Sequence, residues 1–274
     1  QFPRLPKKIT VVMDCAYGAT GEAAKAIWEH QGCDVISLHT ERTGHNINEQ
    51  AGSTDIRRCR AAVLSHRADM GVAFDGDGDR VVLIDEKGNE LDGDDIVYIL
   101  AHHMRERTEG VVTTVMSNGV LNQALTKLGL AHKRVAVGDK HIAKALAQEG
   151  WQLGGEPSGH IMILPHSRSG DGALSGLACA MVAFSLKEKL SDWREALVKY
   201  PKKLVNYPLL TSDARQAEWE SFLQDLQDQS PEIDMLLRKS GTEPLFRVTV
   251  EAQNAKALTA ALATIEKKYA QYLV

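Results

Sequence analysis

Three aspartates alternate with glycines in the segment Phe74-Asp-Gly-Asp-Gly-Asp-Arg80. The carboxylates of Asp75, Asp77 and Asp79 repel one another unless a cation lies among them, and the glycines let the backbone curl so that their oxygens converge. Hard carboxylate oxygens are the ligands that Mg²⁺ prefers, in an octahedron that water or a substrate phosphate completes. The segment therefore predicts a magnesium-binding loop.

Two other interpretations of this acidic loop remain open. One is a solvated acidic turn, and the other is a calcium loop that uses the three aspartates and Glu86 as its positions 1, 3, 5 and 12. Arg80 stands at position 6, where a calcium loop requires glycine, and the flanking residues are typical of strands rather than helices. Arg80 itself either screens the aspartates, contacts a substrate phosphate or forms a surface ion pair.

A second candidate loop is Gly154-Gly-Glu156-Pro-Ser158-Gly-His160. A carboxylate accepts hydrogen bonds, and a hydroxyl both accepts and donates them, so Glu156 and Ser158 suit the adjacent hydroxyls of a sugar. An ordinary Gly/Pro turn would look similar. For His160, a hydrogen-bonded structural role is the more common case.

A third candidate loop is Leu237-Arg-Lys-Ser-Gly-Thr-Glu-Pro244, which lies between two apparent strands. The planar fork of Arg238, the hydroxyls of Ser240 and Thr242 and the backbone N–H groups around Gly241 favour an anion such as phosphate. Arg247 on the following strand lies within reach. The alternative is a hairpin with solvated basic residues.

The elements that must position these loops alternate between strands and helices. We expect strands at 9–14, 34–38, 71–74, 81–85, 111–116, 134–137, 234–237 and 245–252. We expect helices at 20–30, 92–105, 120–128, 171–189, 214–227 and 254–272. The acidic loop then joins two short strands.

The opening pattern recurs along the chain, because Gly18 and Gly32 have counterparts in Gly119 and Gly129 about 100 residues later. We therefore predict an α/β protein with two related β-α-β-type domains, each on a mostly parallel mixed sheet. After Lys199, Pro-containing turns lead into a small C-terminal α+β domain. The expected boundaries are 1–106, 107–200 and 201–274. One larger doubly wound domain in place of the first two is the alternative.

Composition limits the class of protein. The 274 residues carry 32 Lys+Arg against 36 Asp+Glu, a net charge of −4 without a basic run, which favours neither nucleic acid nor an anionic membrane surface as partner. The four scattered cysteines show no C-x-x-C spacing and so predict neither a disulfide framework nor a thiolate metal site. We expect a cytoplasmic protein. Because residue 1 is Gln rather than Met, we also expect the sequence to be a piece of a longer chain.

The three loops, in this order, resemble those of the α-D-phosphohexomutase superfamily. Asp75–Arg80 resembles its metal loop, Gly155–His160 its sugar loop and Arg238–Pro244 its phosphate loop. Further likeness, over essentially the whole chain, comes from Gly44-His-Asn-Ile-Asn48, Val137-Gly-Asp139, Ser169-Gly-Asp-Gly172 and Leu236–Leu245. Pro157 and Lys140 depart from the usual pattern, and the likeness is greatest to the bacterial members that act on glucosamine phosphate.

The resemblance implies roles for individual residues. Three groups follow from it: metal ligands (Asp75, Asp77, Asp79), substrate-binding residues (Glu156, Ser158, His160, Arg238, Ser240, Gly241, Thr242, Arg247) and catalytic residues (Arg80, Lys140). Lys140 would steer a proton or charge near the reacting oxygen, with a plain surface lysine as the alternative. We expect the three loops to face one cleft, with the loop at 238–242 able to move outward in the empty protein.

The resemblance also implies an activity. Members of the family interconvert hexose or hexosamine 6- and 1-phosphates through a bisphosphorylated intermediate, with one Mg²⁺ and a bisphosphorylated sugar as primer. The donor is a phosphoserine in a Thr-Ala-Ser-His-Asn-type loop of a first domain, and neither Ser65-His66 nor Ser117-Asn118 matches it. We therefore expect this chain to need that N-terminal domain as a partner and to be inactive alone. The alternatives are mannose or glucose phosphates as substrates, and a shortened, non-catalytic homologue that binds sugar phosphate; the oligomeric state cannot be read from the sequence.

Overall fold

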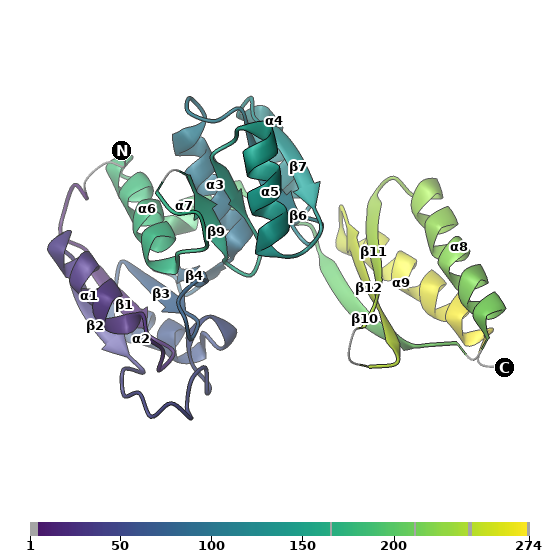
Figure 1. The fold of residues 1–274 in the computed structure, drawn as a ribbon, viewed down its shortest axis with the longest axis horizontal. Coiled ribbons are helices and arrows are strands. Elements are labelled where there is room, and N and C mark those ends of the chain that lie inside the picture. Colours follow the sequence, from purple (N-terminus) through teal and green to yellow (C-terminus); the bar gives the residue numbers. More distant parts are fainter. Residues whose placement is uncertain (1–4, 165, 211, 241–242, 273–274) are drawn as a thin grey trace. The chain divides into compact units, whose positions relative to one another are not determined.

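The computed structural model describes residues 5–164, 166–210, 212–240 and 243–272. The chain forms two compact units, one of residues 1–117 with 121–198 and the other of residues 118–120 with 199–274. Figure 1 shows their elements, and each unit is described by itself. The domain boundaries expected from the sequence stay a prediction.

The first unit contains two mixed sheets that repeat one topology. The first sheet has the order β2-β1-β3-β4-β5, and its strands are β1 (Thr10–Asp14), β2 (Asp34–Leu38), β3 (Met70–Phe74), β4 (Val81–Ile84) and β5 (Glu90–Leu91). The second has the order β7-β6-β8-β9, with β6 (Gly110–Thr114), β7 (Ala131–Val135), β8 (Leu153–Gly155) and β9 (Ile161–Ile163). In both, three parallel strands are followed by antiparallel pairing. The predicted α/β fold with two related repeats, each on its own mixed sheet, is confirmed. Their division into separate domains stays a prediction.

The helices of the two repeats also correspond. The first repeat has α1 (Gly21–His30), α2 (Arg57–His66) and α3 (Gly93–Met104), with a short 3₁₀ turn at Gly52–Thr54. The second has α4 (Val120–Lys127), α5 (Asp139–Glu149) and α6 (Gly172–Ser185), followed by α7 (Leu190–Ala196). The helices α2 and α5 were not predicted, because each begins without a side-chain cap and buries only two or three residues.

The helix that closes each repeat packs on the sheet of the other repeat. The contacts of α3 are mostly with α6 and β8, whereas α6 packs, besides α3, on β3 and β4 of the first sheet and on β9 of its own. A Cβ on Gly155 of β8 would lie 2.8 Å from Val97 of α3, and one on Gly176 of α6 would lie 3.5 Å from Leu83 of β4. This exchange of helices holds the two repeats together, and with them the loops at the ends of β3 and β8.

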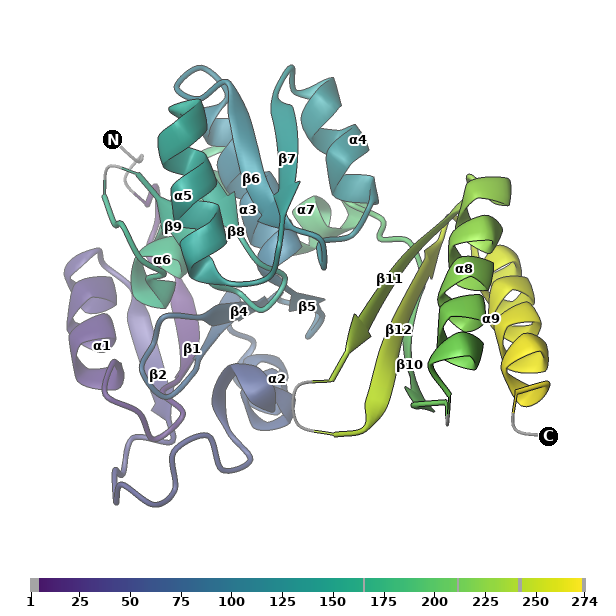
Figure 2. The ribbon, with the colours of Figure 1, turned by 45° about the vertical axis from the view of Figure 1, so that its right-hand side comes forward.

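The second unit is a three-stranded antiparallel sheet covered on one face by two helices (Figure 2). Its elements are β10 (Lys202–Pro208), α8 (Asp213–Gln229), β11 (Ile233–Lys239), β12 (Leu245–Ala252) and α9 (Ala255–Ala270). The core between sheet and helices contains Trp219, Val248, Val250 and Ile265, all fully buried. The predicted α+β domain is confirmed, but one of the Pro-containing turns expected after Lys199, at Tyr207-Pro208, is wrong. These residues end β10, which is an edge strand and therefore tolerates proline.

None of the helices in the described ranges combines the length and the apolar character that crossing a bilayer requires.

The four cysteines are free and buried. Burial raises the pKa of both Cys15 and Cys33 to about 11, and it also raises the pKa of Cys59 and Cys179. A raised pKa keeps each thiol protonated, and the thiolate is the reactive form. We expect Ellman's reagent at about pH 7.5 to modify fewer than about one thiol per native chain, and all of them in denaturant. Rapid modification of the native chain would contradict the burial.

Candidate functional site

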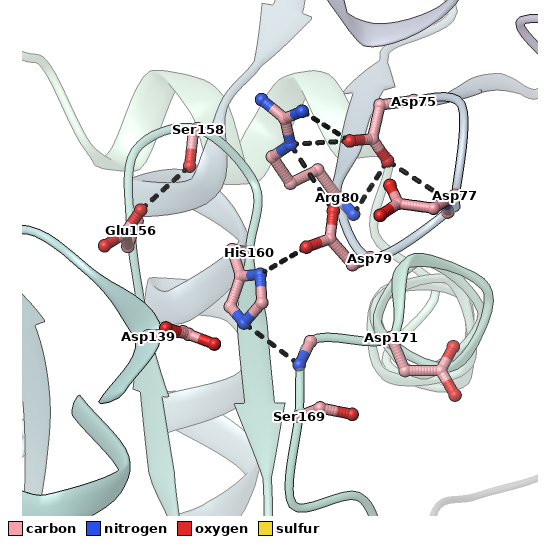
Figure 3. Close-up of polar contacts among 12 residues, drawn as sticks. Asp75, Asp77, Asp79, Arg80, Asp139, Glu156, Ser158, His160, Ser169 and Asp171 are labelled. Atoms are coloured by element: carbon pink, nitrogen blue, oxygen red, sulfur yellow. Dashed lines mark hydrogen bonds and ion pairs between the residues drawn. The ribbon is translucent and has the colours of Figure 1, made fainter. Parts of the chain in front are cut away.

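The acidic loop joins β3 to β4, and its three carboxylates converge as predicted (Figure 3). Asp75 is buried, Asp79 is half-buried and Asp77 is exposed. One oxygen from each can be chosen so that all three lie within 4.8 Å of one another. The flanking elements are strands, so the alternative of a calcium loop between two helices is wrong.

Three hydrogen bonds to carbonyl oxygens fix the backbone of the acidic loop. The carbonyl oxygens of residues 76–78 accept hydrogen bonds from Ala19 N (3.0 Å), Thr20 Oγ1 (3.1 Å) and Gly172 N (2.9 Å), respectively. Gly78 has a φ of +74°, and a Cβ there would lie 1.9 Å from Thr20 Oγ1, so this position requires glycine. With its carbonyls turned away, the loop directs its carboxylates to the opposite side.

Arg80 ends the loop and lies against two of the aspartates. Its guanidinium forms an ion pair with Asp75 Oδ2 at 2.6 Å and a longer one with Asp79 Oδ1 at 3.4 Å. Partial burial opposes the charge of Arg80, but the two carboxylates outweigh it and raise the pKa of the guanidinium. The sequence left three roles open for Arg80. Its ion pairs with Asp75 and Asp79 correspond to the first of them, in which the guanidinium screens the charge of the aspartates.

The donor set fits a hard divalent cation. Asp79 Oδ1 is buried and accepts no hydrogen bond within the described residues; its one charged partner there is Arg80, at 3.4 Å. Asp77 is exposed, and its carboxylate makes no hydrogen bond with the residues drawn in Figure 3. The exposed carboxylate of Asp77 and the Asp79 oxygen that has only a long ion pair with Arg80 lie beside the buried Asp75. This set matches the preference of Mg²⁺ for a few carboxylates completed by water or phosphate.

The predicted sugar loop joins β8 to β9 and so occupies, in the second repeat, the place of the acidic loop in the first. The two loops are in direct contact: Val81 N donates to Gly159 O at 3.1 Å, and Arg80 and His160 form an isolated antiparallel bridge. Equivalent ends of the two sheets thus bring together two segments that are far apart in the sequence (Figure 3).

Glu156 and Ser158 lie on the open part of this loop. Ser158 Oγ donates to Glu156 Oε2 at 3.3 Å, and Gly138 N donates to Glu156 Oε1 at 2.8 Å. The second contact ties the loop to the start of α5, where Lys140 is exposed in the first turn. A lysine is unfavourable at a helix N-terminus unless an anion offsets it. Each carboxylate oxygen of Glu156 keeps a lone pair that a sugar hydroxyl can use.

His160 is nearly buried and points at the acidic loop rather than outward. Its Nδ1 lies 3.0 Å from Asp79 Oδ2, and its Nε2 lies 3.0 Å from the N–H of Gly170. The segment Ser169–Gly172 thus contacts both loops, through Gly170 to His160 and through Gly172 to Gly78. Sequence reasoning noted this segment without a role; its glycines before a helix were the only signal.

The predicted phosphate loop belongs to the second unit, between β11 and β12. Gly241 and Thr242 lie outside the described residues, whereas Arg238, Ser240 and Arg247 are described. Arg238 and Arg247 are directly opposite on the two strands, and like charges in that position destabilise a sheet unless an anion accompanies them. Where this loop lies relative to the other two stays a prediction.

One neighbour of this arginine pair was missed. Asn206 of β10 is opposite Arg247 on the other side of β12, so an exposed amide completes a row of three hydrogen-bonding side chains across the sheet. The row lies on the face away from Val248 and the helices, because side chains alternate along a strand.

Comparisons with known proteins identify relatives of the chain. Residues 3–88 match "Phosphoglucomutase/phosphomannomutase, alpha/beta/alpha domain II", and residues 92–200 match domain III of the same family. Phosphoglucosamine mutase of Psychrobacter sp. (strain PRwf-1) is 42% identical over 252 residues, which cover 90% of this chain and 56% of that protein. The same enzyme of Acinetobacter baumannii (strain AYE) is 40% identical over 272 residues, 96% of this chain and 60% of that protein.

Solved structures share the fold. A phosphoglucomutase/phosphomannomutase family protein from Burkholderia thailandensis has a TM-score of 0.79 at 20% identity, over 99% of this chain and 61% of that one. Aspergillus fumigatus N-acetylphosphoglucosamine mutase in complex with GlcNAc-6P and magnesium has a TM-score of 0.75 at 19% identity, over 95% of this chain and 66% of that one. The chain spans less than two thirds of the length of the curated relatives named above.

Proposed function

The chain belongs to the phosphoglucomutase/phosphomannomutase family, and we propose that it is the metal-, sugar- and phosphate-binding part of a phosphoglucosamine mutase. The whole enzyme would interconvert glucosamine 6-phosphate and glucosamine 1-phosphate in the cytoplasm. The observation that carries the proposal is the direct contact between the acidic loop and the sugar loop, which puts three carboxylates beside groups suited to sugar hydroxyls. The proposed domains are 1–106, 107–200 and 201–274.

Phosphoryl transfer asks the protein mainly for positioning and charge neutralisation. Asp75, Asp77 and Asp79 would hold a Mg²⁺, which supplies positive charge at the transferring phosphoryl group. Glu156 and Ser158 would bind sugar hydroxyls and so orient the reacting oxygen. Arg80 would neutralise charge beside the metal ligands, and Lys140 would steer a proton or charge at that oxygen.

The second unit would bind the phosphate that does not react. Arg238, Ser240, Gly241, Thr242 and Arg247 are the proposed contacts, and Asn206 extends their row across the sheet. The bisphosphorylated intermediate must reorient between the two half-reactions, so that each phosphate in turn reacts. One anion site must therefore accept the phosphate at either end of the intermediate. Two opposed arginines do so because they recognise phosphate and not the sugar ring.

A titration of the chain with glucosamine 6-phosphate in Mg²⁺ tests this assignment. We expect Arg247→Gln to weaken binding by about 10-fold or more, because it removes a charge-assisted hydrogen bond to phosphate worth roughly 1.5–3 kcal/mol. Lys256→Gln, on the exposed start of α9, is the matched control and should leave binding unchanged. Equal binding by all three proteins, measured by calorimetry, would contradict the phosphate site.

The sugar preference is tested in the same way. We propose glucosamine over the alternatives because curated relatives at 40–42% identity are phosphoglucosamine mutases. Tighter binding of mannose or glucose 6-phosphate than of glucosamine 6-phosphate would favour a phosphomannomutase or phosphoglucomutase instead, with Pro157 in the sugar loop as the residue to examine first.

A further inference from the structure

We propose that Asp14 and His39 are positioning residues that set the metal affinity of the acidic loop from outside that loop. This role rests on the metal site of the proposed function and deepens it. Asp14 ends β1 and His39 follows β2, which pairs with β1 in parallel, so both lie at the carboxyl end of the first sheet. The side chain of His39 is 7% exposed and that of Asp14 is fully buried.

Both nitrogens of the His39 ring have a partner. Nδ1 lies 2.9 Å from Asp14 Oδ1, and Nε2 lies 3.4 Å from a guanidinium nitrogen of Arg58 in α2. A guanidinium can only donate, so Nε2 is the acceptor and the proton of the neutral ring is on Nδ1, from which it is donated to Asp14. Asp14 Oδ2 is buried and accepts no hydrogen bond in the described part of the chain, so the contacts of Oδ1 orient the carboxylate.

The carboxylate of Asp14 in turn holds a strained turn that follows β1. Its Oδ1 also accepts from Ala16 N at 3.0 Å, and Ala16 and Tyr17 have φ values of +52° and +55°, in the left-handed region that a Cβ disfavours. Such a conformation persists only where its surroundings hold it. The backbone supplies two more contacts: Tyr17 N donates to His39 O at 2.8 Å, and Asn48 N donates to Ala16 O at 3.0 Å.

The residues that follow this turn lie directly against the acidic loop. Ala19 N donates to Gly76 O at 3.0 Å, and Thr20 Oγ1 donates to Asp77 O at 3.1 Å. A Cβ on Gly18 would lie 2.2 Å from Gly76 O, so the two backbones approach as closely as glycine allows. A change in the turn therefore shifts the backbone that carries the metal ligands. Hydrogen bonds outside the ligand set tune metal affinity in this way.

Two substitutions of His39 separate its hydrogen bond from its backbone conformation, because His39 is itself left-handed at φ +53°. Glycine relieves the strain there but has no donor, whereas asparagine tolerates the left-handed region and places an amide N–H near the position of Nδ1. We expect His39→Gly to lower the affinity for Mn²⁺, used as a paramagnetic probe, by about 10-fold, and His39→Asn to retain it within about 3-fold.

The matched control is Arg67→Gly. Arg67 is also left-handed, at φ +50°, but it is exposed and follows α2, at the opposite end of β3 from the acidic loop. This substitution makes the same backbone change without touching Asp14 or the turn, so it should leave the affinity for Mn²⁺ unchanged.

The measurement is Mn²⁺ binding to the full 274-residue chain, followed by electron paramagnetic resonance, with circular dichroism to show that each variant is folded. Equal affinity of wild type and His39→Gly, or an equal loss in His39→Gly and His39→Asn, would overturn the role of the pair while leaving the metal site intact. Failure of the wild-type chain to bind Mn²⁺ would instead overturn the metal site itself, and this role with it. Long-range ¹H–¹⁵N correlation of the wild-type His39 ring gives a second test that needs no variant: we expect a proton on Nδ1, and an unprotonated Nδ1 would refute the proposal.

Discussion

The Asp77→Ala chain is expected to lose Mg²⁺ binding, by more than about 100-fold, because loss of an outer partner alone lowers metal affinity by about 10–100-fold. Asp77 is the most exposed of the three aspartates, so its removal leaves the buried contacts of the loop in place. Arg80 remains beside Asp75 and Asp79 and would then balance most of their charge. Calorimetry with Mg²⁺ measures the loss directly.

Two controls make this result specific. Glu106→Ala removes an exposed carboxylate elsewhere in the first unit and should leave Mg²⁺ binding unchanged. The melting temperature of Asp77→Ala should stay near that of the wild type or rise, since one of three mutually repelling charges is gone. Unchanged Mg²⁺ binding in a folded Asp77→Ala chain would mean that the acidic loop is only a solvated turn.

The metal loop could be predicted because its determinants are local. Six consecutive residues between two apolar runs contain both the ligands and the glycines, and a strand-loop-strand unit leaves the loop little freedom. The repeat was visible for the same reason, since Gly32 and Gly129 both end a helix in the left-handed conformation. At these positions the residue types alone indicated both the ligands and the backbone conformation that the structure shows.

The contacts that join the loops could not be predicted from the sequence. The hydrogen bonds of Gly170 to His160 and of Gly172 to Gly78 depend on the packing of α6 over the first sheet. No motif in the sequence indicates that a helix of the second repeat packs on the sheet of the first. His160 shows the consequence. Its motif favoured a substrate contact, and the contacts of its ring with Asp79 and Gly170 are seen only in the folded chain.

The second unit shows a different limit. Strand β10 has an exposed, weakly alternating sequence that ends in proline, and it exists because β12 offers it a complete antiparallel register. Asn206 is therefore placed beside the arginines by strand pairing alone, with no motif of its own. A residue of this kind is found only when the sheet is known.

The 274-residue chain by itself is expected to show no mutase turnover with glucosamine 6-phosphate, Mg²⁺ and a bisphosphorylated primer. Phosphoryl transfer by this route needs a serine that is phosphorylated and regenerated, and no serine of this sequence has the Thr-Ala-Ser-His-Asn-type setting. A partial site for metal, hydroxyls and phosphate should remain, so weak binding of sugar phosphate is expected without catalysis. Its Mg²⁺ affinity should also be reduced, because no phosphoserine oxygen helps to balance the three carboxylates.

A polypeptide in which a serine-loop domain precedes this chain provides the comparison. That protein should show mutase turnover in a coupled assay. Among glucosamine, glucose and mannose 1-phosphates, it should have the largest kcat/KM for glucosamine 1-phosphate. Replacing the loop serine by alanine should abolish the restored activity. Turnover by the chain alone that disappears on a Ser→Ala substitution within residues 1–274 would show that the nucleophile is in this chain, and the division of roles proposed between the acidic, sugar and phosphate loops would then have to include it.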